Sequence, residues 1–443
     1  MSRRLPLLFH QVMYNLRGGF LVRPLAIALT LGAAGALLSW LEETFPAIGA
    51  LAPRVIFPSH SDPQVAQVIL GGIGASIMTV VSIVFAILLM TLTLASMQFS
   101  PRIIQGFAQD GVTQWTLGIF LGTFSYCMAA LPAARSYPKP FAPVLTVMGA
   151  MLLALISVAW LLFFIHHISH AINVNRIVDR IASETEVVID QIMPYPRRAL
   201  RLVGDERIDE FKWEVRLPSA ASGYIRFVDL NRLLVLAKTY HLKLRVLRRV
   251  GHFVPQGVPI VAVSRRDRIT PERADAIRAA FDLGPSRTLQ QDVEFGILQI
   301  VDIALKAISP AVNDPSTAIT CVDQLSRLLI RAASREAPES LAYDPPGTFR
   351  LYVPWPGFDR LLDDAFEQIR MYSKADVAVS LRILRALGDI AASTTDEEIH
   401  QLVIDRAQRV VDGCVEHLND HELIEIRARF AAMSTPASMR GTG

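Results

Sequence analysis

The sequence has few cysteines, almost no net charge and none of the common catalytic signatures, and each absence excludes a class of function. Its three cysteines, Cys127, Cys321 and Cys414, are far apart and form no CxxC pair, so they indicate neither a disulfide framework nor a zinc site. The 44 basic and 41 acidic side chains leave a net charge of +3, so we expect no nucleic-acid partner. Walker, GxSxG and HExxH patterns are missing, and no GxGxxG follows a strand, so we expect neither a familiar hydrolase nor a bound cofactor.

Long apolar runs, in contrast, are abundant and lie near the start of the chain. Hydrophobic residues make up 51% of the sequence, and the mean hydropathy is +0.35. A bilayer core of about 30 Å needs about 20 apolar residues in a helix. Four stretches meet this requirement: Pro24–Leu41, Ala66–Met97, Trp115–Ala133 and Pro143–Ile165. The sequence therefore predicts four transmembrane helices, followed by a region with the charged composition of a soluble domain.

Basic residues flank the membrane region and predict its orientation. They precede the first helix and follow the fourth, at Arg3, Arg4, Arg17, Arg23, Arg176 and Arg180. The first connecting loop instead carries Glu42, Glu43 and Asp62 against a single arginine. By the positive-inside rule, both termini are expected to be cytoplasmic. Arg135 and Lys139 in the third loop run against this rule, because they would be external.

The second apolar stretch differs from the others because its small and hydroxylated residues share one side. At about 100° per residue they fall within a single arc of roughly 100°. The members of this arc are Gly72, Ala75, Thr79, Ser82, Ala86, Thr93 and Ser100. The opposite side carries larger residues, which we expect to face lipid: Ile77, Val81, Val84, Ile87 and Leu88.

Two physical causes explain such a stripe, and the sequence leaves both open. Small residues let helices pack closely in lipid, and hydroxyls can line a water-filled pore. A pore lining would have to come from several copies of the chain, because one four-helix subunit is too small to enclose a wide aqueous path. In that case Met90 and Met97 would form narrow points and Arg102 a positive ring at the cytoplasmic mouth. The predicted lining residues are Ala75, Thr79, Ser82, Ala86, Met90, Thr93, Met97, Ser100 and Arg102.

The fourth helix is predicted to continue beyond the membrane as a helical stalk. A stripe of branched apolar residues recurs at helical spacing until Pro194, at Ile177, Ile181, Val188 and Ile192. His166 and His170 are four residues apart and share a face, which is one requirement of a metal pair. No carboxylate lies near them before Asp179, so we interpret them as interfacial histidines and leave any metal site unassigned.

Beyond Phe211 the pattern predicts a small β-rich module and then a helical domain. Strands are expected at Gly223–Val228, Leu242–Leu247 and Val258–Val263, because apolar residues there follow a period of two or form short runs between turns. Asp229 can cap a short helix, and Thr270 with Pro271 can begin another. From there to about residue 429 the pattern is helical, with a loop over 338–357. The sequence thus predicts a membrane α-helical domain of four transmembrane helices at 1–165, a helical stalk at 166–205, a β-rich, barrel-like module at 206–266, a mainly α-helical cytoplasmic domain at 267–432 and a disordered tail at 433–443.

Four polar residues in the helical region are candidates for binding a ligand: Asp292, Asp302, Asn313 and Asp314. Asn313-Asp314-Pro315 fits a turn that enters a helix, with Asp314 as N-cap and Pro315 in the first helical position. The structural alternative is that the Asn313-Asp314-Pro315 turn only caps and begins a helix. The functional alternative is that the four converge on a cation, or that the helix N-terminus receives an anion.

Three motifs, in order along the chain, resemble one bacterial family. They are Met97-Gln98-Phe99-Ser100-Pro101-Arg102 after the second helix, Phe163 with Ile165-His166-His167 at the end of the fourth, and Ser309-Pro310-Ala311-Val312-Asn313-Asp314-Pro315-Ser316-Thr317-Ala318. The chain resembles the predicted membrane proteins grouped as domain of unknown function 2254, from about Asn15 to about Leu418. This resemblance implies a multi-pass protein of the bacterial inner membrane and assigns no activity.

The sequence leaves two functions from different classes. The first is a homo-oligomeric ion channel or pore, in which the second helices surround an axis and the cytoplasmic domain regulates it. The second is a membrane-anchored ligand sensor or enzyme with its site at Asn313-Asp314-Pro315. The stripe favours the first, and the polar cluster favours the second. The expected partners are the lipid bilayer, further copies of the chain and, for a pore, ions.

Overall fold

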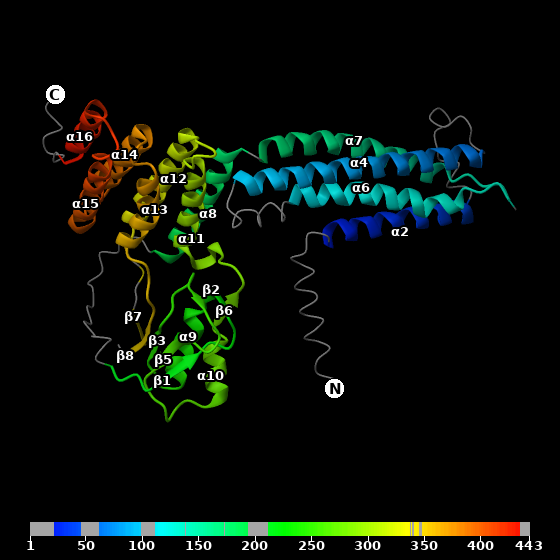
Figure 1. Cartoon of the computed structure of the whole chain (residues 1–443). Helices are drawn as coiled ribbons and strands as arrows, with labels where there is room; N and C mark the ends of the chain where they lie inside the picture. Colours follow the sequence, from blue (N-terminus) through cyan, green and yellow to red (C-terminus); the bar gives the residue numbers. More distant parts are fainter. Residues whose placement is uncertain are drawn as a thin grey trace. The chain divides into compact units, whose positions relative to one another are not determined.

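The structure is a computed structural model, which describes residues 22–45, 62–98, 111–137, 139–171, 173–193, 211–336, 338, 341–344 and 348–434. The chain divides into two compact units, Met1–Asn173 and Val174–Gly443, each with its own internal contacts. Figure 1 shows the helices of the first unit and the sheets and helices of the second. Each unit has its own apolar core.

The first unit contains four long apolar helices among its described residues, as predicted. They are α2 (Val22–Thr44), α4 (Pro63–Gln98), α6 (Gly111–Ala130) and α7 (Val144–Ala171), with a short 3₁₀ turn, η1 (Leu131–Ala133), after α6. Each is long and apolar enough to cross a membrane. Helix α6 contacts the other three and is the most enclosed of the four (Figure 1). The unit is therefore organised around α6.

Helices α2 and α6 run side by side at close range because α6 presents glycine to its neighbour. Gly118 and Gly122 are four residues apart, and a Cβ atom added to either would lie 2.5 Å from the side chain of Ile27 or Leu31. Hydrogen bonds join α6 to α7, with Thr123 Oγ1 and Ser157 Oγ 3.1 Å apart and Trp160 Nε1 donating to Thr116 Oγ1 over 2.9 Å. Small residues and buried hydroxyls thus hold these helices together in lipid.

The larger residues of α4 face the interior of the unit. Ile77 and Val84 are buried against residues of α6 and α7, which include Phe120 and Phe164. Val81, Ile87 and Leu88 are partly buried on the same side. The expectation that this side faces lipid was wrong, because branched apolar residues satisfy a helix interface as well as a bilayer.

The second unit begins with α8 (Val174–Ile192), which lies within the predicted stalk, whereas residues 166–171 of that stretch belong to α7, which ends at Ala171. Its apolar stripe is not free: Ile177, Ile181 and Val188 are buried, and α8 packs on α11 and α12 of its own unit. A continuous apolar stripe needs a partner, and in this unit the partner is the helical part. Residues 194–205 of the predicted stalk lie outside the described residues, as does the predicted tail from residue 435.

Two sheets and two short helices enclose one apolar core in the second unit. The five-stranded sheet has the order β1-β5-β3-β8-β7, and the three-stranded sheet has the order β4-β2-β6. The strands are β1 (Val215–Pro218), β2 (Gly223–Val228), β3 (Leu244–Val246), β4 (Phe253–Val254), β5 (Pro259–Val263), β6 (Phe281–Gly284), β7 (Leu341–Asp344) and β8 (Thr348–Tyr352). Helices α9 (Leu230–Thr239) and α10 (Pro271–Arg278) contribute Leu233 and Ile277 to the core. Asp229 and Thr270 cap these helices, as predicted.

The sheets draw on more of the chain than the β-rich segment predicted at 206–266. Strand β6 follows α10, and β7 and β8 lie within the segment expected to be a loop. Strand β8 pairs parallel to β3, with Leu244 opposite Leu351. Mixed sheets and helices therefore replace the expected sequence of a β module and an all-helical domain. The term "sheet module" denotes residues 215–284 together with β7 and β8.

The helical part of the second unit consists of six α-helices among the described residues, preceded by η3 (Leu289–Gln291). They are α11 (Val293–Ala307), α12 (Pro315–Ala333), α13 (Phe358–Tyr372), α14 (Val377–Ser393), α15 (Glu397–Cys414) and α16 (Asp420–Ser434). Aspartates at 292, 314, 376 and 396 accept backbone N–H groups at four of the N-termini. Helices α11 and α13 begin where the chain leaves β6 and β8, so both start next to the sheet module.

Candidate functional site

The predicted stripe lies on the outward side of α4, away from the rest of its own unit. Ala75, Thr79, Ser82 and Ala86 are exposed, and a Cβ atom added at Gly72 would meet nothing within 4 Å. Met90 and Thr93 of the predicted lining are exposed as well. The side chains of Met97, Ser100 and Arg102 lie outside what the structure describes. The stripe is therefore not used for packing within the described part of this subunit.

The hydroxyl groups of the stripe already have hydrogen-bond acceptors on their own helix. Thr79 Oγ1 donates to the carbonyl of Ala75 over 3.1 Å, and Ser82 Oγ donates to the carbonyl of Met78 over 3.0 Å. This bonding to the preceding turn lets a hydroxyl residue face lipid, another helix or water without losing a donor partner. The hydroxyls are thus compatible with lipid, protein or water. The outward faces of the neighbouring helices are therefore compared with that of α4.

The outward sides of α2 and α7 have a different character. Leu25, Leu29 and Leu37 are more than half exposed on α2, and Leu152, Leu155 and Leu162 are equally exposed on α7. Helix α4 also carries large exposed residues at Phe85 and Leu89, on one margin of the stripe. Bulky outward side chains suit lipid. Large side chains therefore dominate the outward face of α7, whereas α2 exposes alanines beside its leucines and α4 exposes small residues between large ones such as Ile83 and Leu89.

The four predicted ligand-binding residues are not brought together. Asp292 caps the N-terminus of α11, while Asn313 and Asp314 follow its C-terminus. Because α11 has 15 residues, its two ends are about 22 Å apart at about 1.5 Å per residue. Asp302 lies between them, within the helix. A single site formed by all four is therefore not present in this arrangement.

Asp314 has the capping role that the sequence predicts. Its Oδ1 accepts the backbone N–H of Thr317 over 3.1 Å, its Oδ2 accepts the Thr317 hydroxyl over 2.5 Å, and Pro315 occupies the first helical turn. Asn313 has a φ of 50°, a left-handed conformation that asparagine tolerates better than most residues. Local backbone geometry therefore explains the polarity of this turn.

Metal binding has no support among the residues that the structure describes. They contain no group of three or more His, Cys, Asp or Glu side chains placed to hold an ion. His166, interpreted from the sequence as an interfacial histidine, is exposed on α7, and the side chain of His170 lies outside the described residues.

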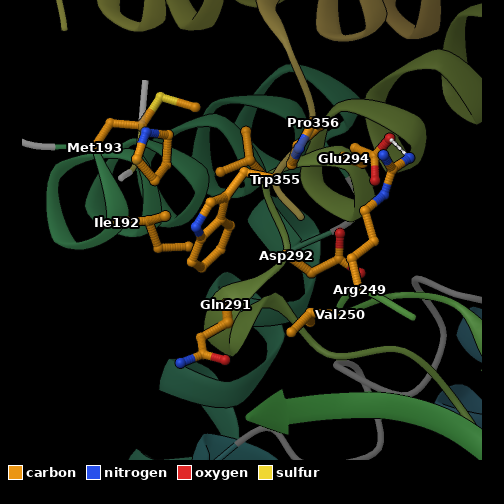
Figure 2. Close-up of a pocket in the computed structure, with 11 residues that line it drawn as sticks. Ile192, Met193, Arg249, Val250, Gln291, Asp292, Glu294, Trp355 and Pro356 are labelled. Carbon is orange, nitrogen blue, oxygen red and sulfur yellow. Dashed lines mark hydrogen bonds and ion pairs between the residues drawn. The ribbon is translucent and has the colours of Figure 1, made fainter. Parts of the chain in front are cut away.

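A cluster that the sequence did not reveal lies where the sheet module meets α11 and α13. Glu294, only 6% exposed in its side chain, accepts one hydrogen bond from Arg249 of the sheet module over 2.8 Å and another from Arg360 of α13 over 2.5 Å. Figure 2 shows Glu294 and Arg249 paired beside Trp355. A cavity of about 20 Å³ lies here, which is room for roughly one water molecule. Arg249 and Arg360 lie 45 and 66 positions from Glu294 in sequence, so no local motif signals the cluster.

Asp364 completes this cluster on α13. Burial, followed by the charge of Glu294, raises the pKa of Asp364 to about 6, and Arg360 opposes this shift. Next to the cluster, Arg287 binds Asp292 through two hydrogen bonds of 2.8 and 2.7 Å. The pKa of His252 is lowered, first by burial and then by Arg249. Glu294, which binds Arg249 and Arg360, thus joins the sheet module to the helices, and Arg360 also lies 3.8 Å from Asp364.

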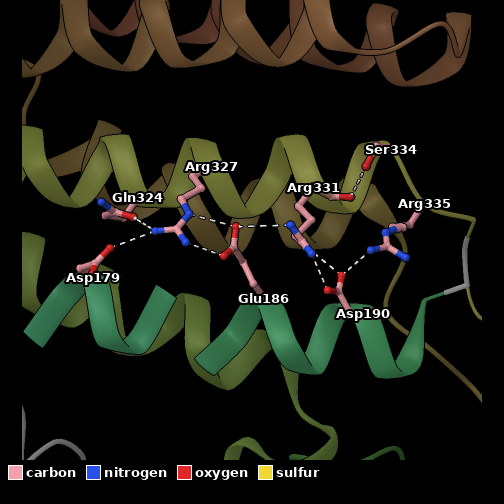
Figure 3. A network of polar contacts seen from close by, with 8 residues as sticks. All are labelled: Asp179, Glu186, Asp190, Gln324, Arg327, Arg331, Ser334 and Arg335. Atoms are coloured by element: carbon pink, nitrogen blue, oxygen red, sulfur yellow. Dashed lines mark hydrogen bonds and ion pairs between the residues drawn. The ribbon is translucent and has the colours of Figure 1, made fainter. Parts of the chain in front are cut away.

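Helix α8 is held to α12 by a ladder of ion pairs (Figure 3). Arg327 donates to Asp179 over 3.0 Å and to Glu186 over 2.9 Å. Arg331 donates to Asp190 over 2.8 Å, and Arg335 donates to the same carboxylate over 2.5 Å. The hydrogen bond from Arg331 is the main reason that the pKa of Asp190 is lowered. Arginine and acid side chains therefore reinforce the apolar contact between α8 and α12.

The apolar helices and the mixed region after them define a class of protein: a multi-helix membrane protein with a large polar region. The family model described as predicted membrane protein, DUF2254, matches residues 17–389, and the chain belongs to this family. The resemblance carried by the three motifs is thereby confirmed. Uncharacterized proteins of Mycobacterium bovis and Mycobacterium tuberculosis are each 32% identical to it over 391 residues, which cover 86% of this chain and 73% of theirs. No solved structure matches the chain.

Proposed function

We propose that the protein forms a homo-oligomeric ion pore in the bacterial inner membrane, with α4 of each copy facing the central axis and the second unit regulating it from the cytoplasmic side. One observation carries this proposal: the small and hydroxylated stripe of α4 is directed away from its own subunit, between exposed large residues such as Ile83 and Phe85, while Ile77 and Val84 pack inward. A helix that merely met lipid would need no such division.

The packing within the unit supports a helical neighbour for this face. Gly118 and Gly122 of α6 occur where α2 makes its close approach. Small residues favour helix association in lipid because they allow backbones to approach, and the hydrophobic effect contributes little there. The same chemistry on the outside of α4 favours a second copy of the chain over acyl chains. Around a symmetry axis, copies of α4 would enclose a path lined by Ser82 and Thr79.

Of the two basic residues that run against the proposed orientation, Arg135 and Lys139, the first forms an ion pair. Arg135, which would be external, pairs with Glu43 at the end of α2, and the side chains are each 39% exposed. Its charge is therefore balanced locally. The arginines before α2 and after α7 support the proposal that both termini and the second unit are on the cytoplasmic side.

Single-cysteine substitutions in planar bilayers test whether water reaches α4. The three native cysteines are buried, so they can be retained. A cationic thiol reagent should cut the current of Ser82→Cys and Ala86→Cys channels by more than half. Val84→Cys is the matched control, because Val84 is fully buried inside the subunit. Absence of current under voltage and tension, or equal sensitivity at positions 82 and 84, would overturn the pore.

A second substitution separates a pore from tight helix packing. Ser82→Leu adds bulk to the centre of the stripe. In a pore it should narrow the path and reduce conductance, while the oligomer keeps its mass in size-exclusion chromatography with light scattering. In a closed helix interface it should instead dissociate the oligomer, and the wild type should carry no current.

The alternative of a membrane-anchored sensor or enzyme at Asn313-Asp314-Pro315 gains no specific support. Capping of α12 accounts for Asp314 and Pro315, and the turn geometry accounts for Asn313. We therefore propose a pore without an enzymatic activity.

A further inference from the structure

We propose that Asp364 and Glu294 form a proton-sensitive latch between the sheet module and the helices of the second unit, which tightens on acidification and loosens as the pH rises. The latch acts at this joint alone, whether or not the chain conducts ions.

The latch lies at the two points where the chain passes from the sheet module into helices. Glu294 is in the first turn of α11, just after the connection from β6, and Arg360 is in the first turn of α13, just after the connection from β8. Arg249 reaches Glu294 from the turn between β3 and β4. One carboxylate thus holds a residue of the sheet module and a residue of α13 at the same time.

The geometry of Asp364 marks it as the titrating member. Its Oδ2 atom is buried and, among the residues that the structure describes, accepts no hydrogen bond, while Arg360 Nε lies 3.8 Å away. An ionised oxygen without a donor in a buried position is unfavourable, whereas a protonated carboxyl can donate to a neighbouring carboxylate. Glu294 is the nearby carboxylate, since Arg360 Nε contacts both Glu294 and Asp364 and the charge of Glu294 raises the pKa of Asp364.

The charges around Asp364 determine the direction of the response. Glu294 faces it from α11, Arg360 from its own helix and Arg249 from the sheet module, and the pKa of His252 nearby is lowered, which favours neutral imidazole. With Asp364 protonated, one carboxylate is shared by two arginines. With Asp364 ionised, two carboxylates compete for Arg360, the more exposed arginine at 54%. Arg360 then moves toward Asp364, and the connection from Glu294 to α13 weakens.

Distance measurements by pulsed electron paramagnetic resonance test the latch in the full-length protein in detergent micelles. Spin labels on Val235→Cys in α9 and Ile424→Cys in α16 report the separation of the sheet module and the helices, and both positions are more than 60% exposed. The native cysteines are buried and should not react. We expect a narrow distance distribution at pH 5 and a shifted or broader one at pH 8, with a midpoint near 6.

Two variants assign the response to its residue. Asp364→Asn imitates the protonated carboxyl and should keep the narrow distribution at every pH. Asp359→Asn changes an exposed carboxylate in the first turn of the same helix and should leave the midpoint where it is. The proposal is refuted if the wild type has the same distribution at pH 5 and 8, if Asp364→Asn still responds, or if Asp359→Asn abolishes the response equally. The wild-type titration decides the matter even if a variant fails to fold.

Discussion

Replacing Glu42 by alanine should destabilise the four-helix unit, because this side chain caps a helix that lacks a cap of its own. Helix α7 begins at Val144 after Pro143, which has no side-chain acceptor. Glu42, 2% exposed near the end of α2, accepts the backbone N–H of Leu145 over 2.9 Å and that of Thr146 over 3.2 Å. It also accepts the Thr146 hydroxyl over 3.1 Å. A residue more than 100 positions away thus satisfies two N–H groups that have no partner within α7.

The size of the effect can be worked out from these contacts. A hydrogen bond to a charged group contributes about 1.5–3 kcal/mol, and contributions of neighbouring bonds do not add fully. Loss of an ordinary N-cap costs about 0.5–2 kcal/mol. We therefore expect Glu42→Ala to lower the free energy of unfolding by about 3 kcal/mol. For a unit of this size, that corresponds to a decrease in melting temperature of about 6–12 °C.

The assay is thermal unfolding of the purified protein in detergent, followed by fluorescence-detected size-exclusion chromatography. Glu43→Ala is the matched control, since the adjacent carboxylate forms only an exposed ion pair with Arg135. That pair should contribute about 1 kcal/mol or less. Equal decreases in melting temperature for the two variants, or none for Glu42→Ala, would refute the capping role.

Four further changes test other contacts by the same melting assay. Gly122→Leu should lower the melting temperature by several degrees, because its side chain would collide with Leu31. Asp314→Ala should cost about 1 kcal/mol, the value of an N-cap, and a much larger loss would point to a ligand. Arg331→Ala should cost about 1 kcal/mol at low salt and less at high salt, as expected for partly exposed ion pairs with α8. The pKa of Asp364 is about 6 in the folded chain and 3.8 ordinarily, so the contribution of this residue to stability falls as the pH rises from about 4 to 6. Asp364→Asn should therefore raise the melting temperature at pH 7.5 and leave it unchanged at pH 4.

The features that the sequence predicted correctly are determined over short stretches of chain. Four apolar runs define four helices because length and composition suffice. Asp229, Thr270 and Asp314 cap helices as expected, because a cap depends on residues within one turn of it. Strand β2 occupies the range predicted for it, Gly223–Val228.

The features that the sequence did not reveal depend on partners far along the chain. The cap of α7 comes from Glu42, which was assigned to a loop and lies buried at the end of α2. Strand β8 joins the sheet through β3, about a hundred residues earlier. The latch brings together Arg249, Glu294 and Asp364, none of which is distinctive in its local sequence. Hydrophobic periodicity gives the faces of an element but does not identify what each face meets.

Helix α4 illustrates that the sequence identifies the faces of a helix but not their partners, and the structure identifies the partner of one face. Its two faces were recognised from the sequence, but an apolar face can meet lipid or protein, and a small one can meet water or another helix. The burial of Ile77 and Val84 assigns the face with the large residues to the interior of the subunit. The face with the small residues is therefore directed at the surroundings of the subunit. The exposed large residues of α4, such as Ile83 and Leu89, suit lipid, whereas the small residues between them suit a close helix contact of the kind that α6 makes with α2 through Gly118 and Gly122. If α4 follows the same rule, its small face meets a helix of another copy, and the choice between a sealed interface and a pore depends on how closely those copies approach.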